Sequence, residues 1–191
     1  LCVYLCVFAF KHMHRQPLLH LLSAYTPTDP HEGRMLDDMI QFVTTHPDCF
    51  ERSLLAGHVT GSAWIVSPDR QRVVLLHHRK LDRWLQPGGH CDGNPDVLEV
   101  ALKEAQEETG LQRLRVVSES VFDVDIHPIP MRGDIPKHLH YDVRFLLEAD
   151  PGEAFGLSDE RKDIQWVPLD KISSLTREES VVRMVWKINS I

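Results

Sequence analysis

The hydrophobic residues between positions 35 and 43 repeat with the spacing of an α-helix. Met35, Met39 and Phe42 are separated by four and three residues, so they lie on one helical face and form a stripe that can pack inward. His46 and Pro47 follow this stripe, and a proline at this position ends a helix. We therefore expect residues 15–56 to form an N-terminal helical segment.

Beyond this segment the pattern changes to that of β-strands. Residues 58–66 are rich in β-prone side chains, residues 67–70 have turn composition, and residues 72–77 form a second β-prone run, which together predict a hairpin. Three further strands and a helical tail are predicted at residues 114–126, 140–148, 163–167 and 169–188. The order of elements predicts an α+β fold with a β-sheet and flanking helices.

Residues 88–111 combine a glycine-rich turn with a short amphipathic helix. Val97, Ala101 and Ala105 recur every four residues, which gives the helix an apolar side. Gly110 is placed to end the helix in a left-handed turn, and Leu111 can supply the hydrophobic contact that often follows such a turn.

Three acidic residues lie on this helix, and their spacing brings their side chains together. Glu107 and Glu108 follow Glu104 by three and four residues, so both lie on the same helical face as Glu104. Gathered negative charges repel one another unless a cation lies among them, and oxygen ligands on a single element suit Mg²⁺ or Mn²⁺ bound to a phosphorylated substrate. A solvated acidic face is the alternative, but the glycines at 88 and 89 favour a phosphate site because backbone can approach closely there.

This stretch resembles the signature of the Nudix hydrolases. That signature specifies a glycine, a glutamate, an arginine-glutamate pair, an aliphatic residue, two glutamates, a glycine and a final aliphatic residue at fixed spacing. The positions that match here are Gly89, Glu104, Ala105, Glu107, Glu108, Gly110 and Leu111. The resemblance implies an α/β/α sandwich with a mixed sheet over residues 57–191.

Two positions depart from the signature. Pro95 replaces the first glutamate, and it is expected to be the first helical residue with Asn94 as the N-cap. Lys103 replaces the arginine, which keeps the positive charge but loses the planar fork of a guanidinium. Lys103 can pair with Glu99 one turn earlier or with Glu107 one turn later.

The resemblance implies Mg²⁺-dependent (or Mn²⁺-dependent) hydrolysis of a nucleoside diphosphate linked to another group, such as ADP-ribose or a nucleotide sugar. Glu104 and Glu108 would be the principal metal ligands, Glu107 a ligand or proton acceptor, and Lys103 part of the catalytic helix. Relatives often use a base outside the signature, and Glu160 is the residue that we expect to fill this role; a solvated loop acid is the alternative.

Other polar residues are weaker predictions. Arg79 and Arg144, together with Gly88 and Gly89, are expected to contact substrate, although exposed cations are usually only surface residues. The histidines considered as metal ligands are His127, His138 and His140. Because a zinc site needs a defined set of ligands, we interpret these histidines as hydrogen-bonded side chains without a metal. His77 and His78 are interpreted in the same way.

Composition restricts the remaining classes. The chain has 191 residues and a formal net charge of −7, which argues against a surface that coats nucleic acid, and no apolar run is long enough to cross a membrane. Four cysteines without a Cys-x-x-Cys pair predict a reducing, cytoplasmic setting. Residues 1–14 are expected to form a poorly ordered apolar extension.

Other functions on the same fold are also considered. A non-catalytic nucleotide-binding or regulatory module is the main alternative, because Pro95 and Lys103 depart from the signature. An isomerase of the same fold is not supported, because the sequence shows no well-placed pair of a cysteine and an acid. The absence of a P-loop pattern disfavours a motor or kinase-type NTPase. Many relatives are dimers, so a homodimer is an expectation from the resemblance alone.

Overall fold

A computed structural model describes residues 14–79, 82–156 and 161–191 and divides them into two compact units. Unit 1 contains the described residues up to Thr60 together with His90–Val97 and Ser120–Val143. Unit 2 contains Gly61–Gly89, Leu98–Glu119 and the described residues of Arg144–Ile191. All but His14 of the expected apolar extension lies outside the described residues, as does Glu160.

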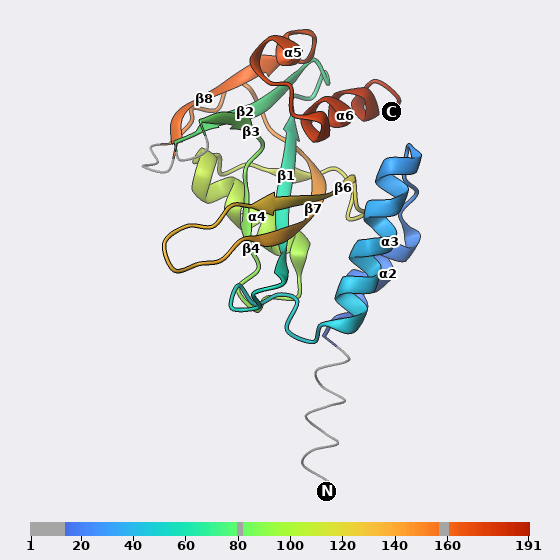
Figure 1. Ribbon diagram of the computed structural model, residues 1–191. Coiled ribbons are helices and arrows are strands. Elements are labelled where there is room, and N and C mark those ends of the chain that lie inside the picture. The colour runs from blue at the N-terminus through green and yellow to red at the C-terminus, as the bar shows by residue number, and fades with distance from the viewer. Residues whose placement is uncertain (1–13, 80–81, 157–160) are drawn as a thin grey trace, which may run out of the picture. The chain divides into compact units, whose positions relative to one another are not determined.

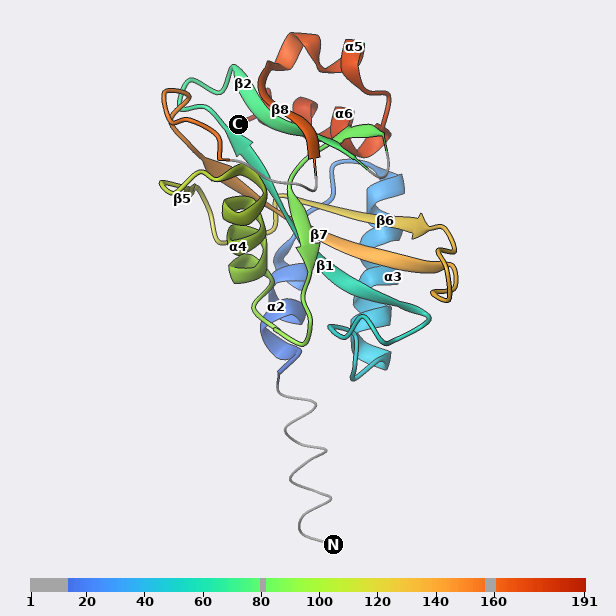
Figure 2. The same ribbon diagram turned by 90° about the vertical axis from the view of Figure 1, so that its left-hand side faces the viewer.

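Unit 1 contains the two N-terminal helices that the sequence predicts, α2 (Gln16–Ala24) and α3 (Pro30–Thr45). The Asp29 carboxylate begins α3 by accepting hydrogen bonds from the His31 and Glu32 N–H groups at 2.7 and 3.0 Å, as an N-cap does. The predicted stripe is buried, and α3 ends where the His46 N–H bonds to the Phe42 carbonyl. In Figures 1 and 2, α2 and α3 run side by side, and α3 also packs on β6 (Asp123–Ile129).

The hairpin predicted at residues 58–77 is formed by β1 (Gly57–Val66) and β2 (Arg72–His78), which pair antiparallel with Val66 opposite Val73. Arg70 in the connecting turn has a φ of 57°. The other edge of β2 pairs with β8 (Arg161–Pro168), so that Val74 lies opposite Trp166, and β3 (Arg83–Leu85) pairs with the end of β2.

The complete sheet has eight strands in the order β3-β2-β1-β7-β5, with β4 paired to β1, β6 to β7 and β8 to β2. The strands not yet introduced are β4 (Gly88–His90), β5 (Arg115–Val116) and β7 (His138–Glu148). β5 pairs antiparallel with β7, with Val116 opposite Leu147. The single strand expected at residues 114–126 is instead two strands, β5 and β6, with a loop between them.

In unit 2 a helix, α4 (Val97–Thr109), carries the acidic residues. Its predicted apolar side is buried, because Ala105 joins a core cluster with Ala63, Ile65 and Val74 of the hairpin. The C-terminal elements are a 3₁₀ turn η1 (Leu169–Lys171), α5 (Ile172–Leu175) and α6 (Glu179–Ile188). Figures 1 and 2 show α5 and α6 beside the β2–β8 pair of this unit.

Two predictions concern the ends of the helix in residues 88–111, and the structure confirms only one of them. The left-handed turn at Gly110 is confirmed: its φ is 78°, and its N–H bonds to the Gln106 carbonyl at 2.8 Å. The predicted helix start is wrong, because α4 begins at Val97 and not at Pro95. Asn94 instead closes a short turn in which its side-chain oxygen accepts the Asp96 N–H at 3.0 Å, so the asparagine caps a turn outside the helix.

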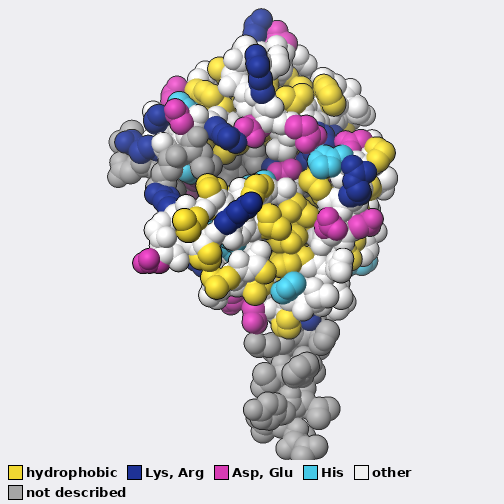
Figure 3. Space-filling view, viewed as in Figure 1, with side chains coloured by type: hydrophobic (Ala, Val, Ile, Leu, Met, Phe, Trp, Pro, Cys, Tyr) yellow, Lys and Arg dark blue, Asp and Glu magenta, His cyan; other side chains and the backbone are white. Residues whose placement is uncertain are grey.

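Charged side chains of both signs lie on the face of the molecule that Figure 3 shows. On the face seen in Figure 3, lysine and arginine side chains alternate with acidic ones and do not gather into a basic field among the described residues. No helix in the described part of the chain has both the length and the apolar character that spanning a membrane requires.

Candidate active site

A hydrogen bond joins the glycine turn to the acidic helix within unit 2. The Gly88 N–H donates to the Glu108 carboxylate oxygen Oε2 at 2.9 Å. Gly88 lies in β4 and Glu108 in the last turn of α4, so the bond connects residues that are 20 positions apart. The carboxylate of Glu108 is thereby held beside the backbone of the turn, where the sequence predicts that phosphate would bind.

The second glycine of the turn makes room for another acid. A Cβ added at Gly89 would lie 2.3 Å from Oε2 and 2.4 Å from Cδ of Glu104. Any larger residue at position 89 would therefore collide with the carboxylate that the sequence predicts to bind metal. The glycine is needed here for this close approach and not for an unusual backbone angle.

Lys103 lies between two of the acids. Its Nζ is 3.4 Å from Glu107 Oε2 and 3.8 Å from Glu104 Oε1. Of the two pairings expected from the sequence, the one with Glu107 is confirmed by this distance. Because Lys103 and Glu107 are 64% and 59% exposed while Glu104 is 21% exposed, the ammonium group partly balances charge at the solvent edge of the acidic face.

Arg161 holds the C-terminal end of α4. Its guanidinium donates to the backbone carbonyls of Glu108 and Gly156, and Gly156 in turn donates its N–H to the Thr109 carbonyl at 2.9 Å. Burial lowers the pKa of Arg161, and the nearby Glu108 charge opposes this shift. A cation at the carbonyl end of a helix is favourable. Arg161 was not predicted as a site residue, because nothing in the sequence around it reveals a distant carbonyl partner.

The acidic residues have the donor chemistry of a site for a hard divalent cation, but among the described residues their carboxylate oxygens do not form a group of three within 4.8 Å of one another. Glu104, Glu107 and Glu108 offer only oxygen ligands from successive turns of one helix, which is the donor type that Mg²⁺ and Mn²⁺ prefer. The space at Gly89 is filled by the Glu104 carboxylate and would be lost with any side chain at position 89. The apolar side of α4 is buried in the core of unit 2, which orients the acids away from it.

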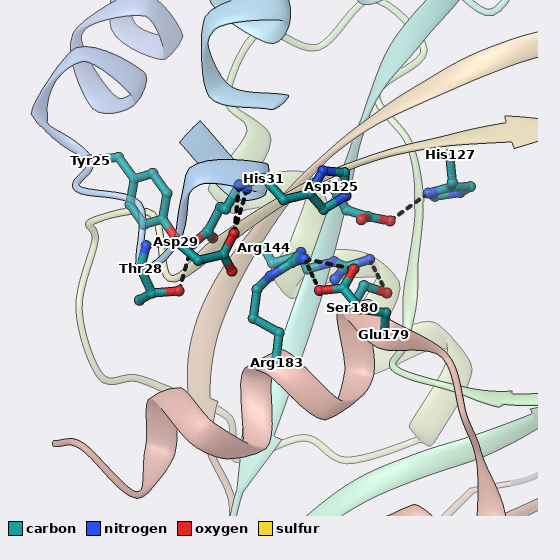
Figure 4. A network of polar contacts seen from close by, with 11 residues as sticks. Tyr25, Thr28, Asp29, His31, Asp125, His127, Arg144, Glu179, Ser180 and Arg183 are labelled. Atoms are coloured by element: carbon teal, nitrogen blue, oxygen red, sulfur yellow. Dashed lines mark hydrogen bonds and ion pairs between the residues drawn. The ribbon is translucent and has the colours of Figure 1, made fainter. Parts of the chain in front are cut away.

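The two arginines predicted to bind substrate lie in different surroundings. Arg79 is exposed, and its side chain donates to the Arg161 carbonyl at 3.4 Å. Arg144 is only 2% exposed, and its guanidinium donates to the Ser180 hydroxyl of α6 at 3.4 Å. Figure 4 shows Arg144 directed at Ser180, next to the Arg183–Glu179 pair of the same unit. Their roles toward substrate stay predictions.

Unit 1 contains a second group of possible metal ligands, made of histidines. One ring nitrogen from each of His58, His138 and His140 lies within 4.8 Å of the other two. His138 and His140 are among the histidines weighed from the sequence, and His58 is not. The only sequence signal was the His-x-His spacing at 138 and 140, because two residues apart on a strand share a face; His58 is 80 positions away from His138.

Comparison with known proteins gives a consistent result. A family model described as a NUDIX domain matches residues 57–184. A CMP-5'-(N-acetyl-N-hydroxy-3-aminopropyl)phosphonate hydrolase of Streptomyces rubellomurinus is 29% identical over 62% of this chain and 55% of its own length. A bis(5'-nucleosyl)-tetraphosphatase of Rattus norvegicus is 28% identical over 56% of this chain and 66% of its own length. The chain thus spans less than two thirds of the length of either relative.

The fold comparison agrees with the sequence comparison. A crystal structure of a C. elegans Ap4A hydrolase binary complex superposes with a TM-score of 0.56 at 17% identity, covering 69% of this chain and 95% of that one. At this identity the likeness concerns the fold, which is a curled mixed sheet flanked by helices. The fold class expected from the sequence is confirmed, including a helix at the N-terminal side.

Proposed function

The chain belongs to the NUDIX family, and from this membership we propose that it is a Mg²⁺-dependent hydrolase that cleaves a diphosphate bond. Its substrate class would be a nucleoside diphosphate linked to another group, as in ADP-ribose or a nucleotide sugar. The observation that carries the proposal is the contact of the Gly88–Gly89 turn with Glu108 and Glu104 on α4. Both curated relatives above are named as enzymes that act on nucleotide compounds, which supports the same chemistry.

Glu104 and Glu108 would be the principal ligands of the metal, and Glu107 would complete the set or accept a proton. When bound, the ion would neutralise charge on the diphosphate oxygens and lower the pKa of a coordinated water. Glu107 is the acid best placed to exchange protons with solvent, because its side chain is 59% exposed, against 21% for Glu104. The family generally uses divalent metals.

The remaining residues would position the substrate. Gly88 and Gly89 are kept as proposed backbone contacts to phosphate, on the sides that Ser62 and the Glu104 carboxylate do not occupy. Lys103 supplies a positive charge beside Glu104 and Glu107, where it can offset the charge of a diphosphate. Arg79 and Arg144 are kept as proposed substrate contacts, and Glu160 as the proposed base outside the acidic helix.

The test is hydrolysis of a substrate panel with identification of products. The panel contains ADP-ribose, nucleotide sugars, dinucleoside polyphosphates and nucleoside triphosphates, each with Mg²⁺, with Mn²⁺ and with EDTA. We expect turnover of at least one diphosphate-linked nucleotide that requires the metal and yields two phosphorylated products. Glu107→Gln should lower this turnover sharply, whereas Glu99→Gln, an exposed acid on the same helix, serves as the control.

The panel also separates the enzyme from a binding module. Tight binding of a nucleotide by calorimetry, with no metal-dependent turnover of any panel member, would overturn the hydrolase proposal. That result would favour the nucleotide-binding alternative raised by Pro95 and Lys103.

A further inference from the structure

Five histidines of unit 1 lie on four strands that are neighbours in the sheet. β4 pairs with β1, β1 lies next to β7, and β6 pairs with β7. These strands carry His90 on β4, His58 on β1, His127 on β6, and His138 and His140 on β7. Because His138 and His140 are two residues apart, both project from the same face of β7.

The rings of these residues crowd around His58. The ring centroid of His58 is 5.0 Å from that of His90, 5.0 Å from that of His138 and 4.8 Å from that of His140. The His90 and His140 centroids are 5.1 Å apart, and those of His127 and His140 are 5.5 Å apart. Crowding of this kind is unfavourable for hydrogen bonding at the centre of the group, since the buried His58 ring is surrounded by other imidazole rings.

Hydrogen bonding shows which nitrogens are without partners. His58 is 2% exposed, and both of its ring nitrogens are buried without a hydrogen-bond partner among the described residues. The Nε2 atom of His140 is also buried without a hydrogen-bond partner among the described residues. Buried polar atoms nearly always have partners, so exceptions of this kind require a physical explanation. The interpretation of His127, His138 and His140 as hydrogen-bonded side chains therefore does not describe Nε2 of His140, and it did not include His58.

Two of the histidines, His127 and His138, are oriented by hydrogen bonds from Nδ1 to an oxygen acceptor. The His138 Nδ1–H donates to the Pro136 carbonyl at 2.9 Å, and the His127 Nδ1–H donates to Asp125 Oδ2 at 3.0 Å, as Figure 4 shows for the second pair. A carbonyl or carboxylate can only accept, so in both rings Nδ1 carries the proton and Nε2 keeps its lone pair. Metal-binding histidines commonly have this arrangement, in which an oxygen behind the ring fixes the tautomer.

We propose that His58, His138 and His140 form a binding site for a divalent transition-metal ion of the Zn²⁺ type, with His90 and His127 as its neighbours. Imidazole nitrogen is a ligand of choice for Zn²⁺ and a poor one for Mg²⁺, which prefers oxygen. An ion at this place would engage the lone pairs that the described residues leave without partners. It would also join β1 to β7 within unit 1.

The geometry requires only small side-chain movements. Tetrahedral ligands about 2.0–2.1 Å from a zinc ion are roughly 3.3 Å from one another, and the three nitrogens already lie within 4.8 Å. Burial, followed by the neighbouring histidines His90 and His138, lowers the pKa of His58 to about 4, and burial likewise lowers that of His140 to about 2.

The experiment is Zn²⁺ binding by the full chain, made without a histidine tag and first stripped with EDTA. Competition with a chromophoric chelator gives the affinity and the stoichiometry, and Co²⁺ absorption reports the coordination geometry. We expect one Zn²⁺ per chain, a tetrahedral Co²⁺ spectrum and a higher melting temperature with Zn²⁺. His58→Gln and His138→Gln should each weaken binding by more than the roughly 10- to 100-fold that loss of an outer partner costs.

Controls separate this site from the acidic helix. His20→Gln changes an exposed histidine of α2 and should leave Zn²⁺ binding unchanged. Glu108→Gln should also leave it unchanged, so failure of the hydrolase proposal and failure of the zinc proposal are distinguishable. His138→Gln keeps the test informative if the buried His58 variant does not fold. Absence of stoichiometric Zn²⁺ binding by the wild-type chain, or equal affinity in His138→Gln, would overturn the proposal.

Discussion

The Gly88 N–H and the Glu108 carboxylate form a hydrogen bond of 2.9 Å that joins β4 to α4. This bond uses one oxygen of the acid and leaves the carboxylate beside the glycine turn. A charged acceptor strengthens such a bond relative to a neutral one. Glu108 therefore has two tasks in the proposed enzyme, since it positions the turn and also contributes charge for metal binding.

Replacing Glu108 with glutamine separates these two tasks. The amide oxygen of glutamine can still accept the Gly88 N–H, so the fold should be retained, but the negative charge for the metal is lost. We expect Mg²⁺-dependent turnover to fall by roughly 100-fold or more, with a melting temperature close to that of the wild type. Steady-state rates over a Mg²⁺ titration and thermal melts followed by circular dichroism are the measurements. Wild-type turnover in this variant would show that Glu108 is not a ligand.

Replacing Gly89 with alanine should disturb Glu104 without unfolding the protein. The added Cβ would lie 2.3 Å from the end of the Glu104 side chain, and a flexible side chain can rotate away from such a contact. The carboxylate would then leave its place, so we expect the Mg²⁺ concentration needed for half-maximal activity to rise by about 10-fold. In the control, Gly33→Ala, the nearest atom is 3.7 Å from the added Cβ. An unchanged metal dependence in Gly89→Ala would contradict this role.

Replacing Lys103 with arginine restores the residue of the family signature. The guanidinium keeps the positive charge near Glu104 and Glu107 and adds a planar fork of donors. We expect activity equal to or higher than that of the wild type, because the lysine side chain is exposed and its two pairs are long, at 3.4 and 3.8 Å. kcat and KM measured side by side for the two proteins provide the check. A large loss would mean that lysine has a role in this chain that arginine cannot fill.

Cys49 should resist alkylation in the folded protein. Burial is the main reason that the pKa of its thiol is raised to about 12, although Arg15 opposes the shift. Only the thiolate reacts, so at pH 8 roughly one molecule in 10⁴ would carry the reactive form. The thiolate fraction rises about tenfold with each pH unit above 8, and it reaches one half only near pH 12.

The measurement for Cys49 is mass spectrometry of its peptide after iodoacetamide treatment at pH 8. We expect the peptide to remain unmodified in the native protein and to be fully modified after denaturation in guanidinium. Rapid modification under native conditions would show that the segment around Cys49 opens easily.

Local periodicity determined much of this protein from sequence alone. The spacing of Met35, Met39 and Phe42 predicted the helix α3, and the positions of Glu104, Glu107 and Glu108 predicted an acidic face on α4. Both helices are confirmed, because residues three and four apart are neighbours in any helix, whatever surrounds it; the role of the three acids as metal ligands stays a prediction. The left-handed turn at Gly110 belongs to the same class, since a helix end depends on a few adjacent residues.

Only the tertiary structure decided which distant residues meet. Pairing of strands brings His58 to His138 and His140, and the fold carries the Arg161 guanidinium to the carbonyl of Glu108. The start of α4 at Val97 was also decided beyond the local sequence, because Asn94 and Pro95 fit a helix start and a turn equally well. Strand neighbours depend on sheet order and register, which no local spacing encodes, so the histidine group could not be predicted from the sequence.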